Sequence, residues 1–433
     1  MRFTSPFLQE LESRGLIHQG TNLEGLDALT AEKSITFYIG YDASAPSLHV
    51  GNLMLIMIMR IAQRHGHRPI VIMGGATTRL GDPTWKDTAR PLLTEETITQ
   101  NISTIKGVFT KYLDFDSGPH KAILLNNDTW LGQIKYLDLL RDVGRFISVN
   151  RMLTFDSVRL RLEREQALTF LEFNYMVLQA YDFFYLNKQY DCMLECGGSD
   201  QWGNIVSGVD LVRRMAQKEA FGLTCPLLTT ASGQKMGKTE KGAVWLNAEN
   251  LSPYDYWQFW RNVEDENVLK FLKIYTDISV AEIDAHTNLS GTELNKLKIR
   301  LADEATILAH GRDALPAIHA TIQTLFEADQ FEIEIDGVDA QGNSVLKSSL
   351  PIIQIKETDL EEGIPIVTLL VQAHLAQSNG EARRLIRGNG CAINGQKITQ
   401  EDFIINETHL QSHHTLRLSA GKKNHVLVQG VKG

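Results

Sequence analysis

A strand–helix–strand pattern near the N-terminus constrains the fold of this chain more than any other feature. Residues 35–41 are β-branched and aromatic, which is typical of a buried strand, and 69–73 form a second apolar run. Between them, 50–65 has a helical pattern, and Gly66 stands where that helix is expected to end. The pattern predicts a βαβ unit with two parallel strands. Ligands bind at the carboxyl edge of such sheets. The polar residues that follow the two strands therefore form one candidate site: Asp42, His49, Thr77 and Asp82.

Changes in pattern divide the rest of the chain. We expect helices at 94–114, 130–146 and 168–186, and a further strand at 189–195. From 254 to 325 the pattern is mostly helical, whereas 329–363 is acidic and lacks helical periodicity, which indicates an irregular segment or linker. The last seventy residues combine short helices at 367–376 and 381–387 with a turn-rich strand at 391–397. The sequence thus predicts an α/β region, an all-α region and a small α+β module.

Charge is distributed unevenly along the 433 residues, whose net charge is −9. Residues 364–433 hold eight Lys/Arg and four Asp/Glu, a net charge of +4, which leaves −13 for the remainder. A basic module on an acidic body indicates a polyanionic partner. Charge alone leaves open the alternative of a solvated surface without a partner.

The sequence shows no sign of membrane insertion or secretion. The apolar run 53–59 is far too short to cross a bilayer, and the first residues lack the hydrophobic region of a signal peptide. We therefore expect a cytoplasmic protein with no membrane partner. The cysteines have no zinc-site spacing, so we expect buried thiols and no protein metal site. They are Cys192, Cys196, Cys225 and Cys391.

Two separated motifs indicate chemistry on a nucleoside triphosphate. His49-Val-Gly-Asn52 stands at the expected junction of strand and helix, where Gly51 permits close backbone approach and the helix N-terminus favours phosphate. Lys235-Met-Gly-Lys-Thr239 places two lysines in a glycine-rich loop. The chain contains no GxxxxGK[ST] run, which argues against a Walker-type NTPase.

These motifs resemble the "HIGH" and "KMSKS" elements of class I aminoacyl-tRNA synthetases. Four further segments are similar to those of bacterial tyrosyl-tRNA synthetases: 38–42 (YIGYD), 81–83 (GDP), 175–182 (YMVLQAYD) and 197–204 (GGSDQWGN). The resemblance extends over nearly the whole chain. It implies that tyrosine, ATP and tRNA are converted to tyrosyl-tRNA, AMP and pyrophosphate.

The resemblance also implies an architecture. It assigns 1–245 to a Rossmann-like, parallel-sheet catalytic domain with a dimer-forming insertion, and 246–328 to an all-α anticodon-side domain. A linker at 329–363 and an α+β RNA-binding module at 364–433 follow. The implied assembly is a homodimer with tRNA bridging the subunits. In the module, three arginines at helical spacing are the implied RNA contacts: Arg383, Arg384 and Arg387.

A tyrosine substrate needs a hydrogen-bond acceptor and a donor for its phenol in a mostly apolar pocket. By resemblance, Asp182 accepts from the phenol and Tyr38 contacts the same oxygen. A substrate without the hydroxyl would leave both groups unpaired, which is costly. The other implied tyrosine-binding residues hold the ammonium group and the carbonyl group being activated: Asp82, Tyr175, Gln179 and Gln201.

In the activation step, the carboxylate of the amino acid attacks the α-phosphorus, and because it is already ionised no general base is required. Catalysis then consists of positioning and of stabilising the pyrophosphate as charge develops. The implied catalytic residues are His49, Asn52, Lys86, Arg90, Lys235 and Lys238. The implied ATP and adenylate contacts are Gly40, Asp42, Ser44, Gly51, Asp200 and Thr239. Mg²⁺ is expected to arrive with the ATP. Asn52 departs from the motif, because it replaces a second histidine with a neutral donor.

Three alternatives were weighed against this interpretation. A tryptophanyl-tRNA synthetase is disfavoured, because an indole needs one acceptor and no donor, whereas Asp182 and Tyr38 supply both. An RNA-binding or splicing relative that has lost the chemistry is disfavoured by the intact motif residues, which include His49, Lys235 and Lys238. A nucleotidyltransferase that makes a small adenylate would have no need of the basic C-terminal module.

Overall fold

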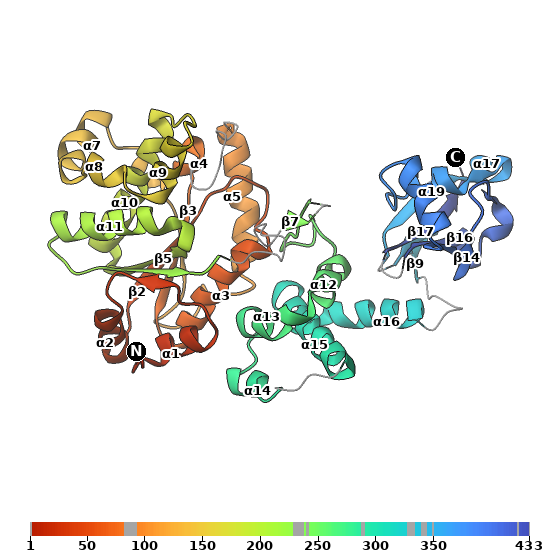
Figure 1. Cartoon of the computed structure of the whole chain (residues 1–433), viewed down its shortest axis with the longest axis horizontal. Coiled ribbons are helices and arrows are strands. Elements are labelled where there is room, and N and C mark those ends of the chain that lie inside the picture. The colour runs from red at the N-terminus through yellow and green to blue at the C-terminus, as the bar shows by residue number, and fades with distance from the viewer. Residues whose placement is uncertain are drawn as a thin grey trace. The chain divides into compact units, whose positions relative to one another are not determined.

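The computed structural model describes residues 2–81, 93–227, 238–239, 242–286, 291–326, 334–338, 344–348, 350–421 and 424–432. The chain forms two compact units, Met1–Arg312 and Asp313–Gly433 (Figure 1). The finer division into four segments made from the sequence stays a prediction.

A six-stranded sheet forms the centre of the first unit. Its strands are β1 (Gln19–Gly20), β2 (Thr36–Tyr41), β3 (Arg68–Met73), β4 (Ile123–Asn126), β5 (Cys192–Gly198) and β6 (Phe221–Cys225). They lie in the order β1-β6-β5-β2-β3-β4. All neighbours pair in parallel except β1 and β6, which are antiparallel. The predicted parallel α/β sheet is confirmed, with one short antiparallel edge strand that the sequence did not indicate.

The strand order places a topological switch point between β2 and β5. Helix α3 (Val50–Arg64) connects β2 to β3, and α11 (Trp202–Met215) connects β5 to β6, so the chain runs outward in opposite directions from the middle of the sheet. Right-handed crossovers then place the two helices on opposite faces. Helix α10 (Phe170–Tyr190) packs along α11 and contacts β5 (Figure 1). A ligand site is expected where the carboxyl ends of β2 and β5 diverge.

The other helices of the first unit cover the sheet or extend the chain beyond it. Before α10 come α1 (Pro6–Ser13), α2 (Leu23–Glu32), α4 (Thr77–Leu80), α5 (Glu95–Phe109), α6 (Asp128–Leu131), α7 (Tyr136–Asp142), η1 (Gly144–Phe146), α8 (Val149–Met152) and α9 (Asp156–Glu163). The short helix η2 (Ser199–Gln201) follows β5, and β7 (Lys238–Thr239) pairs with β8 (Gly242–Ala243). The single helix predicted at 130–146 is wrong. The segment is interrupted at Gly132, which caps α6, and again before Gly144.

A helical segment completes the first unit. It comprises α12 (Pro253–Arg261), η3 (Asp265–Asn267), α13 (Val268–Tyr275), α14 (Val280–Asp284) and α15 (Gly291–His310), and η4 (Arg312–Ala314) follows. The helical pattern predicted here is confirmed. Arg14, which is 4% exposed, holds the end of α13 to the N-terminus. Its guanidinium donates to the carbonyl groups of Lys273 (2.6 Å) and Ile278 (3.0 Å).

The second unit has its own sheet and core. Its elements are α16 (Leu315–Phe326), β9 (Glu334–Val338), β10 (Ser344–Lys347), β11 (Ile352–Lys356), α17 (Glu357–Glu362), β12 (Ile364–Pro365), α18 (Ile366–Gln372), α19 (Asn379–Arg387), β13 (Cys391–Ile393), β14 (Gln396–Ile398), β15 (Ile404–Ile405), η5 (Glu407–His409), η6 (Ser412–His414), β16 (Thr415–Ala420) and β17 (Asn424–Val431). The sheet runs β11-β17-β16-β13-β14, and residues of α18 and α19 join its apolar core. The prediction of an irregular segment at 329–363 is wrong for three parts of it: β9 pairs with β10, β11 pairs in parallel with β17, and α17 is a helix.

The structure also bears on the cysteines and on membrane-spanning helices. All four cysteines are buried and free, as predicted. Among the described helices, none combines the length and the hydropathy needed to span a membrane.

Candidate active site

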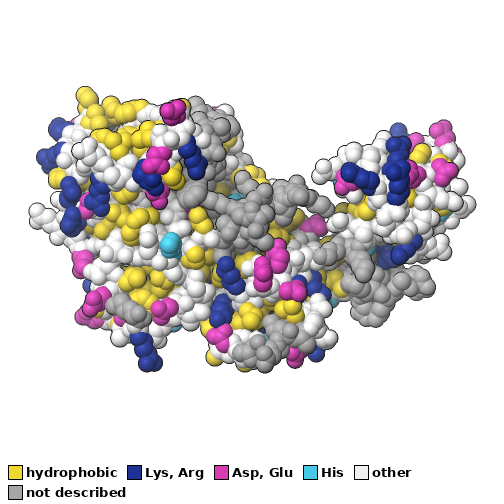
Figure 2. Space-filling view, viewed as in Figure 1, with side chains coloured by type: hydrophobic (Ala, Val, Ile, Leu, Met, Phe, Trp, Pro, Cys, Tyr) yellow, Lys and Arg dark blue, Asp and Glu magenta, His cyan; other side chains and the backbone are white. Residues whose placement is uncertain are grey.

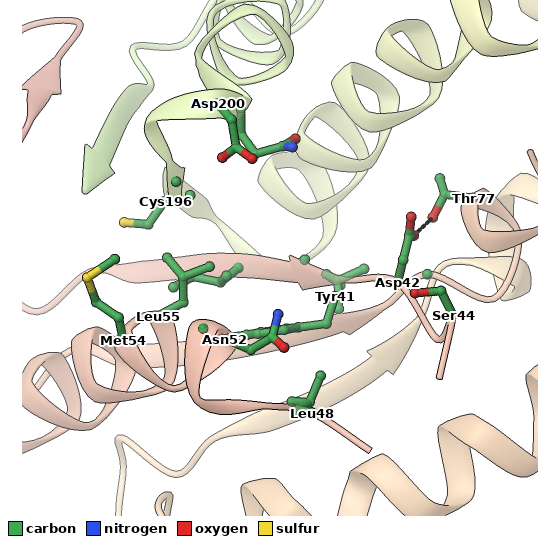
Figure 3. Close-up of a pocket in the computed structure, with 18 of the residues that line it drawn as sticks. Tyr41, Asp42, Ser44, Leu48, Asn52, Met54, Leu55, Thr77, Cys196 and Asp200 are labelled. Carbon is green, nitrogen blue, oxygen red and sulfur yellow. Dashed lines mark hydrogen bonds between the residues drawn. The ribbon is translucent and has the colours of Figure 1, made fainter. Parts of the chain in front are cut away.

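A cavity of about 630 Å³ opens at the switch point between β2 and β5. Figure 3 shows its lining side chains, with Asp200 after β5 and Asn52 on α3 on opposite sides of the space. Twelve of the eighteen residues predicted to act on tyrosine or ATP line it: Tyr38, Gly40, Asp42, Ser44, His49, Gly51, Asn52, Tyr175, Gln179, Asp182, Asp200 and Gln201. Residues that are distant in the sequence thus meet in one space.

Six of the predicted residues cannot be placed in this way. Asp82, Lys86, Arg90 and Lys235 lie outside the described residues. Lys238 and Thr239 form β7, of which only the backbone is described.

Asp182 lies on α10, lines the cavity and is 3% exposed. Its carboxylate accepts two hydrogen bonds, one from Trp130 Nε1 (2.7 Å) and one from Asn127 Nδ2 (3.0 Å). Trp130 is itself held by stacking on Tyr185, with ring centroids 4.4 Å apart. Because two side chains fix the carboxylate, its orientation is set before any ligand enters.

Burial governs the protonation of this region. Desolvation raises the pKa of Asp182 to about 7, against the hydrogen bonds from Asn127 and Trp130, which favour the ionised form; the charge of Asp42 adds to the rise. Desolvation also raises the pKa of the Tyr38 hydroxyl well above its usual value, and the charges of Glu195 and Asp182 raise it further. Tyr38 is therefore a neutral hydroxyl at physiological pH.

Asp42 follows β2 and joins the middle of the cavity to α4 and α10. Its carboxylate accepts from the Tyr175 hydroxyl (3.1 Å) and from Thr77 Oγ1 (3.0 Å), and the latter contact is drawn in Figure 3. A side chain at Gly74 would place its Cβ 2.3 Å from Asp42 Oδ1, so this position accommodates only glycine. Asn127 Nδ2 also donates to Thr77 (3.2 Å), which connects this cluster to Asp182.

A second polar cluster connects α10, β5 and α11. Asn204 Nδ2 donates to the side-chain oxygens of Gln179 (3.0 Å) and Gln201 (2.9 Å). Gln179 Nε2 in turn donates to Glu195 Oε1 (2.9 Å). Gln179 is thereby held through both ends of its amide, which fixes the direction in which it faces the cavity.

The first motif begins α3 with a reciprocal capping arrangement. His49 Nδ1 accepts from the Gly51 amide (3.0 Å), and Asn52 Oδ1 accepts from the His49 amide (3.2 Å). Because the Asn52 oxygen is occupied by this bond, its Nδ2 group is directed to the cavity, as Figure 3 shows. Asn52 therefore combines two tasks, a cap for α3 and a neutral donor facing the site.

Four residues of the site were missed by the sequence interpretation: Asn127, Trp130, Glu195 and Asn204. Asn127 follows β4, so the short apolar run 123–125 was the available signal for a third strand end at this edge. Glu195 stood in the predicted strand at 189–195, where a charged residue among apolar neighbours is unusual. The roles of Trp130 and Asn204 depend on tertiary contacts and had no sequence signal.

The three predicted RNA-contacting arginines lie on α19 in the second unit, and all are exposed. Arg387 and Arg383 form ion pairs with Glu401, the latter at 3.7 Å. Arg384 forms no ion pair with any described residue. The helix thus presents exposed positive charge to solvent.

Family models match most of the chain. The model for tRNA synthetases class I (W and Y) matches residues 30–327, and the model for the tyrosine–tRNA ligase SYY-like C-terminal domain matches 345–428. The second match includes β11, in agreement with its place in the C-terminal sheet.

Known proteins are similar over the full length. A tyrosine–tRNA ligase of Rickettsia felis is 49% identical over 423 residues, which are 98% of this chain and 99% of the relative. The tyrosine–tRNA ligase of Brucella abortus is 49% identical over 427 residues, 99% of each chain.

Solved structures agree with the fold. A C-terminally truncated mitochondrial tyrosyl-tRNA synthetase of Aspergillus nidulans has a TM-score of 0.67 at 29% identity and covers 74% of this chain and 94% of its own. A tryptophanyl-tRNA synthetase of Encephalitozoon cuniculi has a TM-score of 0.52 at 12% identity, covers 71% of this chain and 87% of its own, and shows only the common fold.

The relatives that are similar over the full length are tyrosine enzymes, and the C-terminal model is that of a tyrosine–tRNA ligase. The tryptophan alternative is therefore not favoured. The enzyme uses ATP as a substrate, as class I synthetases do. The chain belongs to the class I tRNA synthetase family for tryptophan and tyrosine, and within it to the tyrosine–tRNA ligases.

Proposed function

We propose that the cavity selects tyrosine by its phenol at the Asp182 end and activates it at the α3 end. One observation carries this proposal. The buried Asp182 carboxylate is oriented by Trp130 and Asn127, and the buried Tyr38 hydroxyl, which lines the same cavity, has no hydrogen-bond partner among the described residues. An ionised acceptor and an unpaired donor in one apolar recess suit a phenol. An amino acid without the hydroxyl would leave both unpaired.

The other end of the amino acid is proposed to meet the polar clusters around it. Tyr175 and Gln179 stand one helical turn apart on α10 and both line the cavity, which supports contacts with the ammonium group. Asp82 completes that set in the proposal. Gln201 is held by Asn204 and is proposed to contact the carbonyl group being activated.

ATP is proposed to bind between the carboxyl end of β2 and the start of α3. Asp200 is proposed to hold the ribose, and Gly40, Asp42 and Ser44 to contact the adenylate. Gly51 and the N-terminus of α3 would receive phosphate, with charge-stabilising groups around the leaving pyrophosphate. Those groups are His49, Asn52, Lys86, Arg90, Lys235, Lys238 and Thr239. Mg²⁺ enters as part of the ATP substrate, bound to its phosphates.

The second unit is proposed to bind tRNA through α19. The exposed Arg383, Arg384 and Arg387 support this, because guanidinium groups on one helix surface suit phosphate contacts. The proposal places the reaction in the cytoplasm.

A homodimer is proposed from the surface of the first unit. Eight of the ten exposed large hydrophobic residues among those described fall within 136–171. In Figure 2, apolar side chains gather over α7, α8 and α9. An apolar surface of this kind marks an association site. The residues are Tyr136, Leu137, Leu140, Val149, Leu153, Leu162, Phe170 and Leu171.

Amino-acid-dependent ATP–pyrophosphate exchange tests the proposed specificity. Tyrosine should support exchange, whereas phenylalanine and tryptophan at equal concentration should not. Tyrosine should then be transferred to tRNA in the same preparation. Exchange with tryptophan at a rate similar to that with tyrosine would refute the proposed specificity.

A further inference from the structure

Glu195 is a buried acid with no part in the proposed activation chemistry. It lies on β5, lines the cavity and is 1% exposed. Its Oε1 atom accepts from Gln179 Nε2 (2.9 Å), whereas Oε2 has no hydrogen-bond partner among the described residues. A buried carboxyl oxygen without a partner is costly and requires an explanation.

Tyr38 on the neighbouring strand β2 supplies the explanation. The Tyr38 hydroxyl is also buried and unpaired among the described residues. Tyr38 and Glu195 are paired residues of the parallel strands β2 and β5, so their side chains lie on the same face of the sheet. Each group raises or lowers the pKa of the other. Two buried polar atoms without a hydrogen-bond partner among the described residues thus belong to neighbouring residues of adjacent strands, and a small movement of the side chains would pair them.

Packing holds both groups in place. A Cβ atom at Gly208 of α11 would lie 2.7 Å from Glu195 Oε2 and 3.1 Å from Phe183, so α11 approaches closely only because this residue is glycine. Phe183 packs against the Tyr38 ring, with centroids 5.4 Å apart. Glu195 is thus confined between α10 and α11, and Tyr38 packs against α10.

We infer that Glu195 is a positioning residue for tyrosine selection: its carboxyl group, held by Gln179, turns the Tyr38 hydroxyl so that it donates to the phenol oxygen of the substrate. The inference rests on the proposed function of the pocket and extends it to a residue that does not touch the substrate.

The direction of the hydrogen bonds depends on the proton of Glu195. When protonated, Glu195 donates to the Tyr38 oxygen, Tyr38 donates to the phenol, and the phenol donates to Asp182. When ionised, Glu195 instead attracts the Tyr38 proton, and the phenol meets acceptors only. The protonated form is therefore the one that binds tyrosine.

The surroundings favour that form at neutral pH. Burial raises the pKa of Glu195 to about 8, against the lowering effects of the Gln179 hydrogen bond and of the nearby Tyr38 hydroxyl, and the charge of Asp182 raises it further. The titratable groups around it are Tyr38 on β2, Asp182 on α10 and the thiols Cys192 and Cys196 on its own strand. Asp182 accepts hydrogen bonds from two donors, Trp130 and Asn127, whereas Glu195 accepts one, from Gln179, so the negative charge is better stabilised on Asp182 and the proton on Glu195.

The test uses the full-length enzyme with Glu195→Ala, Glu195→Gln and Tyr38→Phe. Steady-state exchange kinetics give kcat and KM for tyrosine and for phenylalanine. Glu195→Ala should raise the KM for tyrosine and lower the tyrosine/phenylalanine ratio, with kcat little changed. Glu195→Gln should restore most of that ratio, because its amide nitrogen donates permanently to Tyr38 while its oxygen still accepts from Gln179. In the Tyr38→Phe background, Glu195→Ala should cause no further decrease of the tyrosine/phenylalanine ratio.

The pH profile is a readout that a merely structural role would not change. Between pH 7 and pH 9 the KM for tyrosine in the parent should rise by about tenfold relative to its value in Glu195→Gln, since the protonated form of Glu195 decreases about tenfold over this range. Glu195→Gln retains only the pH dependence that comes from Asp182 and from the substrate. Ionisation of the substrate ammonium affects both enzymes equally, so the difference between them reports Glu195.

Three results would overturn the inference: an unchanged tyrosine/phenylalanine ratio in Glu195→Ala, the same pH dependence in the parent and in Glu195→Gln, or a Glu195→Gln enzyme as impaired as Glu195→Ala. If Glu195→Ala does not fold, the pH comparison decides alone. Asp182→Ala distinguishes a failure of this inference from a failure of the pocket assignment. If it lowers the ratio while the Glu195 variants do not, the pocket stands and this inference fails; if neither lowers it, the pocket assignment itself fails.

Discussion

Asp182 must stay ionised although it is buried, which is the main electrostatic cost of the site. A buried carboxylate is costly in the free enzyme, and Trp130 and Asn127 lower that cost by donating to both of its oxygens. The same two bonds favour the ionised form, which is the better acceptor for a phenol. Acceptor strength is thus obtained from two neutral donors rather than from a cation.

Replacement of Trp130 by Phe tests this directly. The aromatic ring can still stack on Tyr185, but Asp182 loses its shorter hydrogen bond. The pKa of Asp182 should then rise above about 7. Since the ionised form binds tyrosine, kcat/KM should fall more at pH 6.5 than at pH 8, by roughly tenfold for each unit of pKa rise. The pH–rate profile for tyrosine activation measures this shift.

Trp257 provides a matched control. Its Nε1 donates to Asp303 Oδ1 at the same 2.7 Å, in the helical segment α12–α15. Trp257→Phe should affect stability without moving the acid limb of the profile. A shift of equal size in both variants would show that the limb does not report Asp182.

The roles of residues within recognisable sequence motifs could be predicted from the sequence, whereas the roles of other residues could not. Asp42, His49 and Asp182 were named from segments with a recognisable spelling, and all three line the cavity. Trp130 and Glu195 were missed, because their importance comes from the side chains they meet across the fold. No local pattern marks a tryptophan whose partner lies fifty-two residues later.

Among the elements, α3 couples stability to chemistry at its first turn. Asn52 caps the helix with its oxygen and faces the cavity with its nitrogen. Asn52→Asp keeps an acceptor for the His49 amide but removes the donor and adds negative charge beside the proposed phosphate site. Its thermal stability should match the parent, while single-turnover adenylate formation should slow. Asn52→Ala should lose both functions.

The magnitude for Asn52→Ala follows from the loss of one preorganised donor, ~10²–10³ in rate. Tyrosine affinity should stay unaltered, because Asn52 is proposed to act on the phosphates of ATP and not on the amino acid. An Asn52→Ala enzyme as fast as the parent would show that the reaction does not use this donor.

The helices and strands with a clear local pattern were predicted from the sequence. Those with a weak pattern, or with a pairing partner far along the chain, were missed. The β2–α3–β3 unit and α10 lie close to their predicted ranges, because apolar periodicity and end signals agree there. The break between α6 and α7 was missed, since a single glycine is compatible with a helix in the sequence. Strand β11 was missed because it pairs with β17, more than seventy residues further along the chain.

The proposed dimer is tested at the scale of the whole molecule. Leu137, which is 76% exposed on α7, belongs to the apolar surface within 136–171. Leu137→Asp should shift the mass in analytical ultracentrifugation from two chains to one chain of 48.6 kDa. Ile299→Asp changes an exposed apolar residue elsewhere and should leave the mass unchanged. A parent that sediments as a single chain would contradict the dimer.

The second unit should act on tRNA only. A chain that ends at Leu350, before β11, removes the entire C-terminal sheet without leaving β11 unpaired. This truncated enzyme should form tyrosyl-adenylate at a rate close to that of the parent and charge tRNA poorly. Its tRNA binding should also depend less steeply on salt, because phosphate contacts are lost. Normal charging by the truncated chain would exclude a tRNA contact in the C-terminal sheet and the helices packed on it.

The most direct measurement is the ratio of kcat/KM for tyrosine and phenylalanine in ATP–pyrophosphate exchange, compared between the parent and Asp182→Ala. If Asp182 selects the phenol, the variant should lose discrimination mainly through tyrosine, with phenylalanine little changed. A charged hydrogen bond contributes about 1.5–3 kcal/mol, so the ratio should fall by at least about tenfold. A ratio that is the same in both enzymes would contradict the assignment of the pocket.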